Sequence, residues 1–486
     1  MTSSAPALAS RKTPALSVAW LQVSVLVVLF ALAAVIQSRT LSSLTSLENS
    51  DIWWHLRTGL WILQNHAVPH TALFSQSESL PWVSPSWAYE FFVALSFKAL
   101  GFAAIPLLAM LFKTGLAALT FILGGGLRGR FWLAAILSAV VQFVLGTVQP
   151  GPGYCSILLF AAELVLLLNF RREGRIQRLY WLAPVFLLWA NLDLQFVYGI
   201  VVLLMFVIGA AIERRNNDAR LRNDPKLLWV MAACIAASVV TPYFYRPYVE
   251  FFRVLTSSAN QYFPELHAMS FHRPQDYLLL LLAMSAFLVM GMRHSSDLFQ
   301  IALLSGSTAL SFHSQSNTWL VALAAVAVIG DDNITTAQPL KTRGSVASII
   351  LAGAVVLVAI LCLPPRQTLA THVAQAYPVG ASDYIREHAL PQPLFNAAEW
   401  GGFLAWYLPD YPVAIDGRRN LYPDDFVSQY AKAMNAEVRY TDFPAMATAR
   451  TLIFPKTSLM GQALRTVPSY TVAYGDNVAM VLVRKD

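Results

Sequence analysis

The stretch from Asp51 to Arg57 brings together side chains that can do chemistry. Its sequence, DIWWHLR, holds an acid, two tryptophans, a histidine and an arginine within seven residues. A carboxylate can take the proton of a hydroxyl group, and a guanidinium can steady an anion as its charge develops. Asp51 is therefore a candidate catalytic base, and His55 and Arg57 are candidates for binding a substrate.

A second interpretation of the same residues is structural. The apolar residues of 52–64 share one helical face, which predicts an amphipathic helix in the headgroup layer of a membrane, with its tryptophans at the depth they prefer. Asp51 would then cap the free backbone N–H groups at the start of this helix. The residues alone leave both interpretations open.

Composition sets the class of protein. The 486-residue chain is 56% hydrophobic and 13% charged, whereas a soluble protein of this size carries about twice that charged fraction. Apolar runs of membrane-spanning length recur along the chain, which predicts a polytopic α-helical membrane protein. The net charge of +7 does not indicate nucleic-acid binding, because the basic residues cluster in short loops between apolar runs. The first run is too long for a signal peptide.

Eleven predicted crossings place every basic cluster on one side of the membrane. Since basic loops stay in the cytoplasm, the tail 1–16 is predicted to be cytoplasmic and the C-terminus extracytoplasmic. The short piece 87–98 carries Glu90 and Lys98 and is predicted to be a second interfacial helix, within the outer loop 38–100 of the transmembrane domain 17–365. The predicted spans are 17–37, 101–124, 131–148, 153–170, 179–193, 195–212, 227–243, 276–292, 297–313, 317–330 and 345–363.

Polar and aromatic residues gather at the outer ends of these spans. They occur in the segments QPGPGY, NLD, TPYFYRPY, PELHAMSFHRPQD and HSQSN. Turn chemistry explains any one of them, but five such ends favour an outward-facing cavity, with interfacial helices that let a lipid tail remain in the bilayer. The candidate binding residues here are Asn191, Asp193, Arg246, Glu265 and His267.

Residues 366–486 lack a span and are predicted to form a small extracytoplasmic α/β domain. ASDYIREHAL is typical of a helix, and PLFN, YPVAIDG, TLIFP, YTVAYG and VAMVLV are typical of short strands. Asp416 and Arg418 lie in a predicted turn, where a simple ion pair is one explanation. In the functional interpretation Glu399, Trp400, Asp416 and Arg418 lie over the cavity, with Trp400 offering a face to a sugar and Arg418 a contact to phosphate.

Metal binding is not indicated by the histidines or cysteines. The three cysteines lie in or beside apolar runs, and neither they nor the histidines show ligand spacing. Binding of a divalent cation between Asp51 and a phosphate is left as an open alternative, and no other cofactor is predicted.

Three segments resemble a known family. DIWWHLRTGLWILQNHAVPHTALFS with PWVSPSWAYEFFVALSFKALG, LLWANLDLQFVYG, and PLFNAAEWGGFLAWYLPDYPVAIDGRRNLYP are similar to the GT-C superfamily of polytopic glycosyltransferases, and more closely to bacterial GT-C-like membrane proteins of undefined substrate. The resemblance implies a sugar donor carried on polyprenyl phosphate and chemistry on the outer side. It also implies that Asp51 is the acid of the first outer loop, acting as base or orienting the acceptor.

The sequence departs from the family pattern at two outer span ends. Where the family carries Asn-Leu-His, this chain has Asn191-Leu192-Asp193. Where the family carries an Arg-Pro pair, this chain has Gln149-Pro150. An arginine there would suit the phosphate of a lipid-linked donor, and Arg57, Arg246 and Arg273 are candidate replacements.

Three functions stay open at this stage. The first is an inverting membrane glycosyltransferase in a bacterial inner membrane, which uses a lipid-linked sugar and an unidentified glycan, lipid or protein acceptor. The second is a non-catalytic protein of the same fold in envelope polysaccharide or glycolipid assembly. The third, a transporter of lipid-linked sugars, is disfavoured because charged residues are expected to avoid mid-span positions and no inverted repeat is visible.

Overall fold

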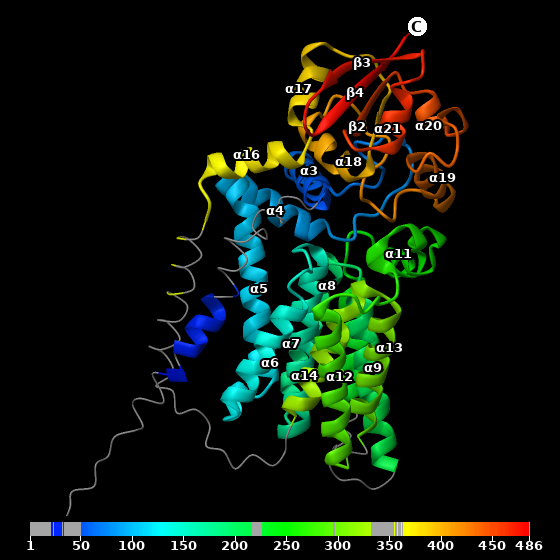
Figure 1. Cartoon of the computed structure of the whole chain (residues 1–486). Coiled ribbons are helices and arrows are strands. Elements are labelled where there is room, and N and C mark those ends of the chain that lie inside the picture. The colour runs from blue at the N-terminus through cyan, green and yellow to red at the C-terminus, as the bar shows by residue number, and fades with distance from the viewer. Residues whose placement is uncertain are drawn as a thin grey trace, which may run out of the picture.

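In a computed structural model the chain forms a helical bundle that is covered at one end by a small domain of helices and strands (Figure 1). The structure describes residues 21–22, 24–31, 33, 50–215, 226–294, 297–331, 354, 357, 361 and 363–485. Three helical stretches in this part are long and apolar enough to cross a membrane, Trp87–Arg128, Pro152–Glu173 and Pro274–Met292. The length and composition of these helices indicate an integral membrane protein.

Helices occupy every predicted span between residues 101 and 330, but the predicted count of eleven crossings is not confirmed. The ranges 17–37 and 345–363 lie largely outside the described residues, and several bundle helices are shorter than a membrane-spanning helix requires. The bundle helices are α5 (Ala104–Leu123), α6 (Phe131–Val144), α7 (Pro152–Glu173), α8 (Leu182–Leu192), α9 (Phe196–Arg215), α10 (Lys226–Val239), α12 (Pro274–Met292), α13 (Leu298–His313) and α14 (Thr318–Gly330).

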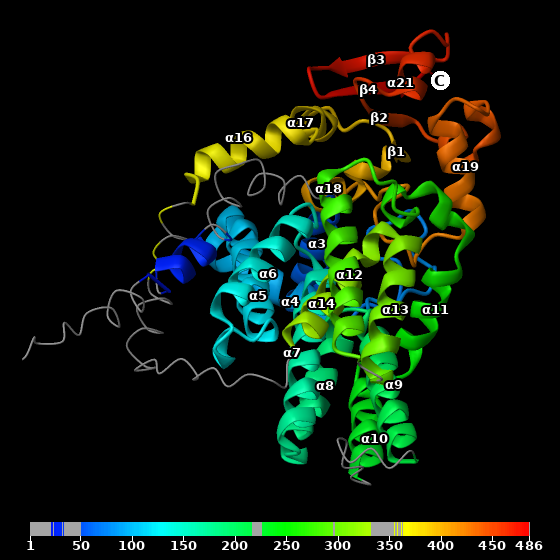
Figure 2. The ribbon, with the colours of Figure 1, turned by 60° about the horizontal axis from the view of Figure 1, so that its bottom comes forward.

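Helix α14 is the centre of the bundle. Every residue from Thr318 to Gly330 is buried, as expected for a helix that is apolar on all sides. Gly330 permits close contact with α5, because a Cβ at this position would overlap the backbone carbonyl of Leu123. The turned view in Figure 2 shows α8, α9 and α10 reaching furthest from the C-terminal strands.

Two charged residues are buried inside bundle helices, which corrects one sequence argument. Glu163 in α7 is fully buried, and Lys113 in α5 is 4% exposed and donates a hydrogen bond to the carbonyl of Gly146 (3.0 Å). The expectation that charges avoid mid-span positions is therefore wrong. It no longer gives a reason to disfavour a transporter of lipid-linked sugars.

The segment between the first two predicted spans forms two helices, α3 (Ser50–Asn65) and α4 (Trp87–Leu100). Gly101 separates α4 from α5 with a φ of +62°, a left-handed conformation that glycine adopts without strain. The chain turns there, and Figure 1 shows α4 lying across the upper end of α5. Phe92 and Leu95 of α4 are exposed, so its interfacial position stays a prediction.

Helix α3 is enclosed by protein, which differs from the predicted helix in the headgroup layer. It packs between α4 and α18 (Ala398–Tyr407) of the C-terminal domain. Trp53 is fully buried and makes edge contacts with Tyr377 and Phe403 and a stacked contact with Trp406. Such aromatic contacts stabilise a protein interior beyond the burial of area, so this tryptophan joins the outer loop to the C-terminal domain.

The C-terminal domain contains a four-stranded sheet in the order β1-β2-β4-β3. The pair β1–β2 is parallel, and the pairs β2–β4 and β3–β4 are antiparallel. The elements are α16 (Arg366–Ala376), α17 (Val379–Glu387), β1 (Leu394–Asn396), α18, α19 (Asp424–Met434), α20 (Pro444–Ala447), β2 (Thr451–Pro455), α21 (Leu459–Leu464), β3 (Tyr470–Gly475) and β4 (Ala479–Arg484).

The predicted strand at 411–417 is absent from this sheet. Its backbone instead pairs with the outer loop, since Val413 donates to the carbonyl of Phe74 and accepts from the N–H of Gln76. The buried Asn396 holds the next residues, because its side chain bonds to Ala414 and Ile415. These contacts fix the turn that follows, from Asp416 onwards, against the outer loop.

The amphipathic helix α11 (Arg246–Thr256) lies between the bundle and the C-terminal domain. The turn after it bonds to the domain, because Ser257 and Ser258 donate their hydroxyl protons to Asp424, each over 2.7 Å. These hydrogen bonds hold the pKa of Asp424 below its usual value.

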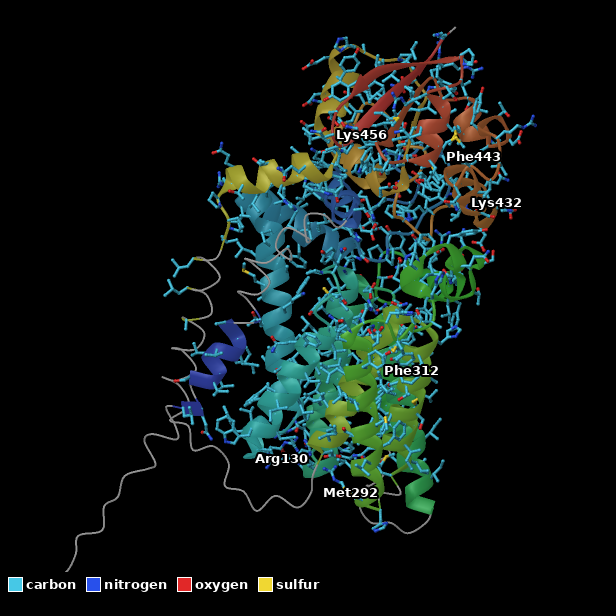
Figure 3. The ribbon with its side chains drawn as sticks, viewed as in Figure 1. Arg130, Met292, Phe312, Lys432, Phe443 and Lys456 are labelled. Atoms are coloured by element: carbon cyan, nitrogen blue, oxygen red, sulfur yellow. The ribbon has the colours of Figure 1, made fainter. Side chains whose placement is uncertain are left out.

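Arginines close the end of the bundle that is opposite to the C-terminal domain. Arg128 and Arg130 donate to the carbonyls of Gly330 and Ile329, and Arg293 donates to three carbonyls at the end of α14. Figure 3 shows Arg130 and Met292 at this end, far from Lys432 and Lys456 of the domain. A helix leaves its last four carbonyls without intrahelical partners, and the arginines supply donors for those of α14.

Candidate functional site

A cavity of about 430 Å³ opens where the bundle, the outer loop and the C-terminal domain meet. Its lining comes from residues far apart in the sequence, namely α3, the segment 144–153, the break between α8 and α9, the segment 315–318, and the turn 417–420. The cavity is therefore built by all three parts of the molecule, and neither the bundle nor the domain encloses it alone.

Close backbone contacts fix α3 beside the cavity. A Cβ at Gly59 would overlap the backbone carbonyl of Glu90 in α4, and a Cβ at Gly402 of α18 would lie 2.6 Å from the carbonyl of Ser50. A Cβ at Gly417 would overlap Oδ1 of Asp51. Glycine at these positions lets α4, α18 and the turn pack directly on α3, which determines where Asp51 lies.

Asp51 lies in the first turn of α3 and lines the cavity. Its Oδ1 accepts a hydrogen bond from the indole N–H of Trp54 (3.2 Å). Burial raises the pKa of the Asp51 carboxyl, while the nearby charges of His55 and Arg419 act to lower the same pKa. A carboxylate whose pKa is raised by burial is better suited to accept a proton.

Asp193 supplies a second carboxylate to the same cavity. It follows α8 directly, and its Oδ2 accepts the hydroxyl proton of Ser156 over 2.6 Å. Ser156 accepts in turn from the indole N–H of Trp189 (2.6 Å). The break between the two helices thus presents a fixed acid.

The turn from Asp416 to Asn420 brings two arginines to the cavity with different surroundings. Arg418 is 2% exposed, forms an ion pair with Asp416 (2.6 Å), and lies over the ring of Trp82. Arg419 is exposed and lines the cavity. Asn420 accepts from the indole N–H of Trp82 (3.1 Å) and donates to the carbonyl of Val83 (2.9 Å), which fixes the turn.

The structure brings part of the predicted site together. The predicted residues that line the cavity are Asp51, His55, Asp193, Glu265, Arg273 and Arg418. The remaining predicted residues, Arg57, Asn191, Arg246, His267, Glu399, Trp400 and Asp416, do not line it.

Several of the excluded residues have structural contacts instead. Trp400 is 5% exposed within an apolar cluster, so it offers no face to a sugar in the cavity. Asn191 donates to the carbonyls of Leu187 and Val240 and accepts from Trp87. Arg57 lies over the ring of Phe74.

The other four predicted residues also do not line the cavity. His267 bonds to the carbonyl of Gln261 over 2.8 Å. Arg246 and Glu399 are exposed. Asp416 is held by its ion pair with Arg418. None of the four contributes to the lining.

Arg419 and Gly417 line the cavity but are not among the predicted site residues. Both belong to the segment DGRRN, from which the sequence predicts Arg418 as a phosphate contact. Adjacent arginines in a turn point in different directions, and the sequence does not show which one faces the cavity. The preceding glycine was a usable signal, since a glycine beside charged residues marks a close backbone approach.

The donor set does not fit a metal centre made by protein side chains alone. No group of three His, Cys, Asp or Glu residues that could hold a metal ion occurs in the described part of the chain.

Comparison with known proteins identifies the fold. No protein-family model matches the chain, and no curated protein matches it in sequence. Among solved structures, it is similar to the archaeal oligosaccharyltransferase AglB from Archaeoglobus fulgidus, in complex with an inhibitory peptide and a dolichol-phosphate, with 12% identity and a TM-score of 0.59 over 91% of this chain and 70% of that one. ArnT from Cupriavidus metallidurans, bound to undecaprenyl phosphate, matches at 12% identity with a TM-score of 0.48 over 96% and 98% of the two chains.

The match to AglB shows the fold of this chain. It shares the fold of this oligosaccharyltransferase, which agrees with the resemblance to the GT-C superfamily noted in its sequence.

Proposed function

We propose that this protein is an inverting glycosyltransferase that transfers a sugar from a polyprenyl-phosphate donor to an acceptor on the extracytoplasmic side of the membrane. One observation carries the proposal: the buried carboxylate of Asp51 lines a cavity shared by the bundle, the outer loop and the C-terminal domain. The GT-C fold supports it, and AglB, which shares this fold, is an oligosaccharyltransferase in complex with a dolichol-phosphate.

The proposed reaction needs one base and one cation. The acceptor hydroxyl loses its proton to a carboxylate oxygen of Asp51 while its own oxygen bonds to the anomeric carbon. The bond between that carbon and the phosphate oxygen breaks on the opposite face, and the phosphate leaves on the polyprenyl chain. The base raises the electron density on the attacking oxygen, and a cation steadies the charge that develops on the phosphate.

Arg419 is the cation that best suits the leaving phosphate. Arg418 already has a carboxylate partner in Asp416 and is buried against Trp82, so its charge is already balanced inside the protein. Arg273 also lines the cavity, but its guanidinium bonds to Asp276 (2.9 Å) and Gln315 (3.0 Å). Arg419 is exposed on the cavity wall, in electrostatic range of both Asp51 and Asp193.

A comparison of cells with and without the gene tests the function. Cells that lack the protein should lose one glycan or glycolipid and accumulate its polyprenyl-phosphate-linked precursor, because the donor is no longer consumed. Total lipids and cell-surface glycans would be measured by mass spectrometry, and the gene supplied on a plasmid should restore both. Unchanged lipid-linked sugars and glycans in the deleted cells would contradict the proposal.

A further inference from the structure

A buried histidine–carboxylate pair lies directly behind Asp51. Nδ1 of His55 in α3 lies 3.2 Å from Oε1 of Glu90 in α4, and both side chains are almost fully buried. The other carboxylate oxygen of Glu90 accepts the hydroxyl proton of Ser84 over 2.7 Å. Burying a carboxylate and an imidazole together is costly unless they are paired, so this arrangement needs a reason beyond packing.

The imidazole ring is held between the pair and the cavity. Trp54 packs on one side of the ring at a centroid distance of 3.5 Å, and Tyr89 makes an edge contact at 5.3 Å. His55 lines the cavity whereas Glu90 does not. Asp51 precedes His55 by four residues, which places both on the same face of α3.

We propose that Glu90 positions His55 as the cation of a series of alternating charges, Glu90–His55–Asp51, which keeps Asp51 ionised in its buried position. The charge of a protonated His55 would then act on two carboxylates, on Glu90 by direct contact and on Asp51 through electrostatics. Glu90 and His55 are thus positioning residues, and the inference rests on the proposed role of Asp51 as the base.

The surroundings of Asp51 explain why such a cation is needed. Burial raises the pKa of Asp51, and the charge of Asp416 acts in the same direction. His55 and Arg419 are the cations that oppose this rise. Tyr89 and Tyr243 are further ionisable groups near Glu90. Without His55, the exposed Arg419 and the hydrogen bond from Trp54 would be left to favour the ionised carboxylate.

Two substitutions of the same histidine separate positioning from packing. Asparagine places an amide nitrogen near the position of Nδ1, and glutamine places one near Nε2. His55→Asn keeps the hydrogen bond to Glu90, so its unfolding midpoint should stay near that of the parent. Its kcat/KM should fall about tenfold at neutral pH, with the acidic limb of the pH profile moved up by about one unit, because the cation that favours ionised Asp51 is lost. His55→Gln should also lower the midpoint.

Transfer would be measured with full-length protein in lipid nanodiscs and the lipid extract of cells that lack the protein, which supplies the accumulated donor and the acceptor. A His55→Asn variant that folds and keeps the parental rate and acidic limb would overturn the inference, because the pair would then be structural only. If the parent itself transfers no sugar, the proposed function fails. The inference about His55 is then tested by the pH dependence of stability, which needs no substrate.

The stability of the fold reports the ionisation of Asp51 without any substrate. Because burial raises the folded-state pKa of Asp51, its ionisation weakens the fold as the pH rises from the unfolded to the folded pKa. The difference in unfolding midpoint between the parent and Asp51→Asn therefore changes across this pH window and is constant above it. In a His55→Asn background, the window should extend to higher pH. An identical window in both backgrounds would refute the inference.

Discussion

The two ends of the bundle both concentrate charged side chains, but they use them differently. At the end opposite to the C-terminal domain, Arg128, Arg130 and Arg293 bond to backbone carbonyls of α14, and Arg172 pairs with Asp331 (2.7 Å). At the end beneath the domain, charged side chains line an open cavity of about 430 Å³. At one end the cations stabilise the fold, and at the other end they line a volume that can hold a ligand.

The difference shows why charge alone does not identify a site in a membrane protein. The buried C-terminus of α14 needs donors for its last carbonyls, and cations there also interact favourably with the helix dipole. Functional candidates are better recognised by an open volume beside them and by charges that are not fully used in pairs. Arg418 and Arg419 illustrate the two cases within a single turn.

The largest expected effect is on stability and concerns the buried ion pair of Asp416 and Arg418. Its arginine is used within the fold, as are the arginines at the opposite end of the bundle. Arg418→Ala leaves Asp416 buried without its partner and should destabilise the fold by about 3–5 kcal/mol. Thermal unfolding of the purified chain would measure this, with Arg419→Ala as the matched control, whose midpoint should stay near that of the parent. An unchanged midpoint for Arg418→Ala would mean that the pair contributes little.

The cavity end should be sensitive to a single added carbon. Gly417→Ala places a methyl group where Oδ1 of Asp51 lies, so the carboxylate or the turn must move, and transfer should fall roughly 100-fold. The matched control is Gly151→Ala, because Gly151 lines the same cavity and a Cβ there has nothing within 4 Å. Equal activity in the two variants would count against the docking of the turn on Asp51.

A substitution at the opposite end of the bundle should lower the stability of the fold and leave catalysis unchanged. Arg293→Ala removes three hydrogen bonds from the carbonyls of Val328, Ile329 and Asp331, which should cost about 1–3 kcal/mol of stability. The rate per folded molecule should equal that of the parent. Arg439→Ala, which removes an exposed ion pair with Asp442, should leave the unfolding midpoint unchanged. A lower rate per folded Arg293→Ala molecule would contradict the distinction between an end that stabilises the fold and an end that binds the ligand.

The smallest expected effect concerns the cation at the cavity. Arg419→Gln should reduce kcat/KM by about tenfold, because one charge-assisted contact to the phosphate is lost, with little change in stability. Arg246→Gln serves as the control, since Arg246 is exposed and lies outside the cavity lining. If both variants behave alike, Arg419 does not contact the donor.

The sequence predicts the elements well where a local pattern decides them. The bundle helices between 101 and 330 follow from apolar runs, and the strands that contain Phe395, Ile453 and Val481 follow from short apolar segments between turns. The position of Asp51 beside a cavity also follows, because the polar segments gather at one set of helix ends.

The parts that the sequence does not predict depend on contacts between distant segments. Val413 pairs with the outer loop more than 300 residues earlier, so its segment is no strand of the sheet. Trp400 is buried because α18 packs on α3. The pairing of His55 with Glu90 depends on how two helices lie against each other. Composition and periodicity carry no information on such contacts.

The central claim is that Asp51 removes the proton of the acceptor, and one measurement tests it most directly. Purified parent and Asp51→Asn would be placed in nanodiscs with the lipid extract of cells that lack the protein, which supplies the accumulated donor and the acceptor. Asparagine keeps the shape of the side chain but does not serve as a base. The account predicts an unfolding midpoint at least as high as that of the parent and transfer reduced by about two to four orders of magnitude. A variant that folds and transfers sugar at the parental rate would contradict it.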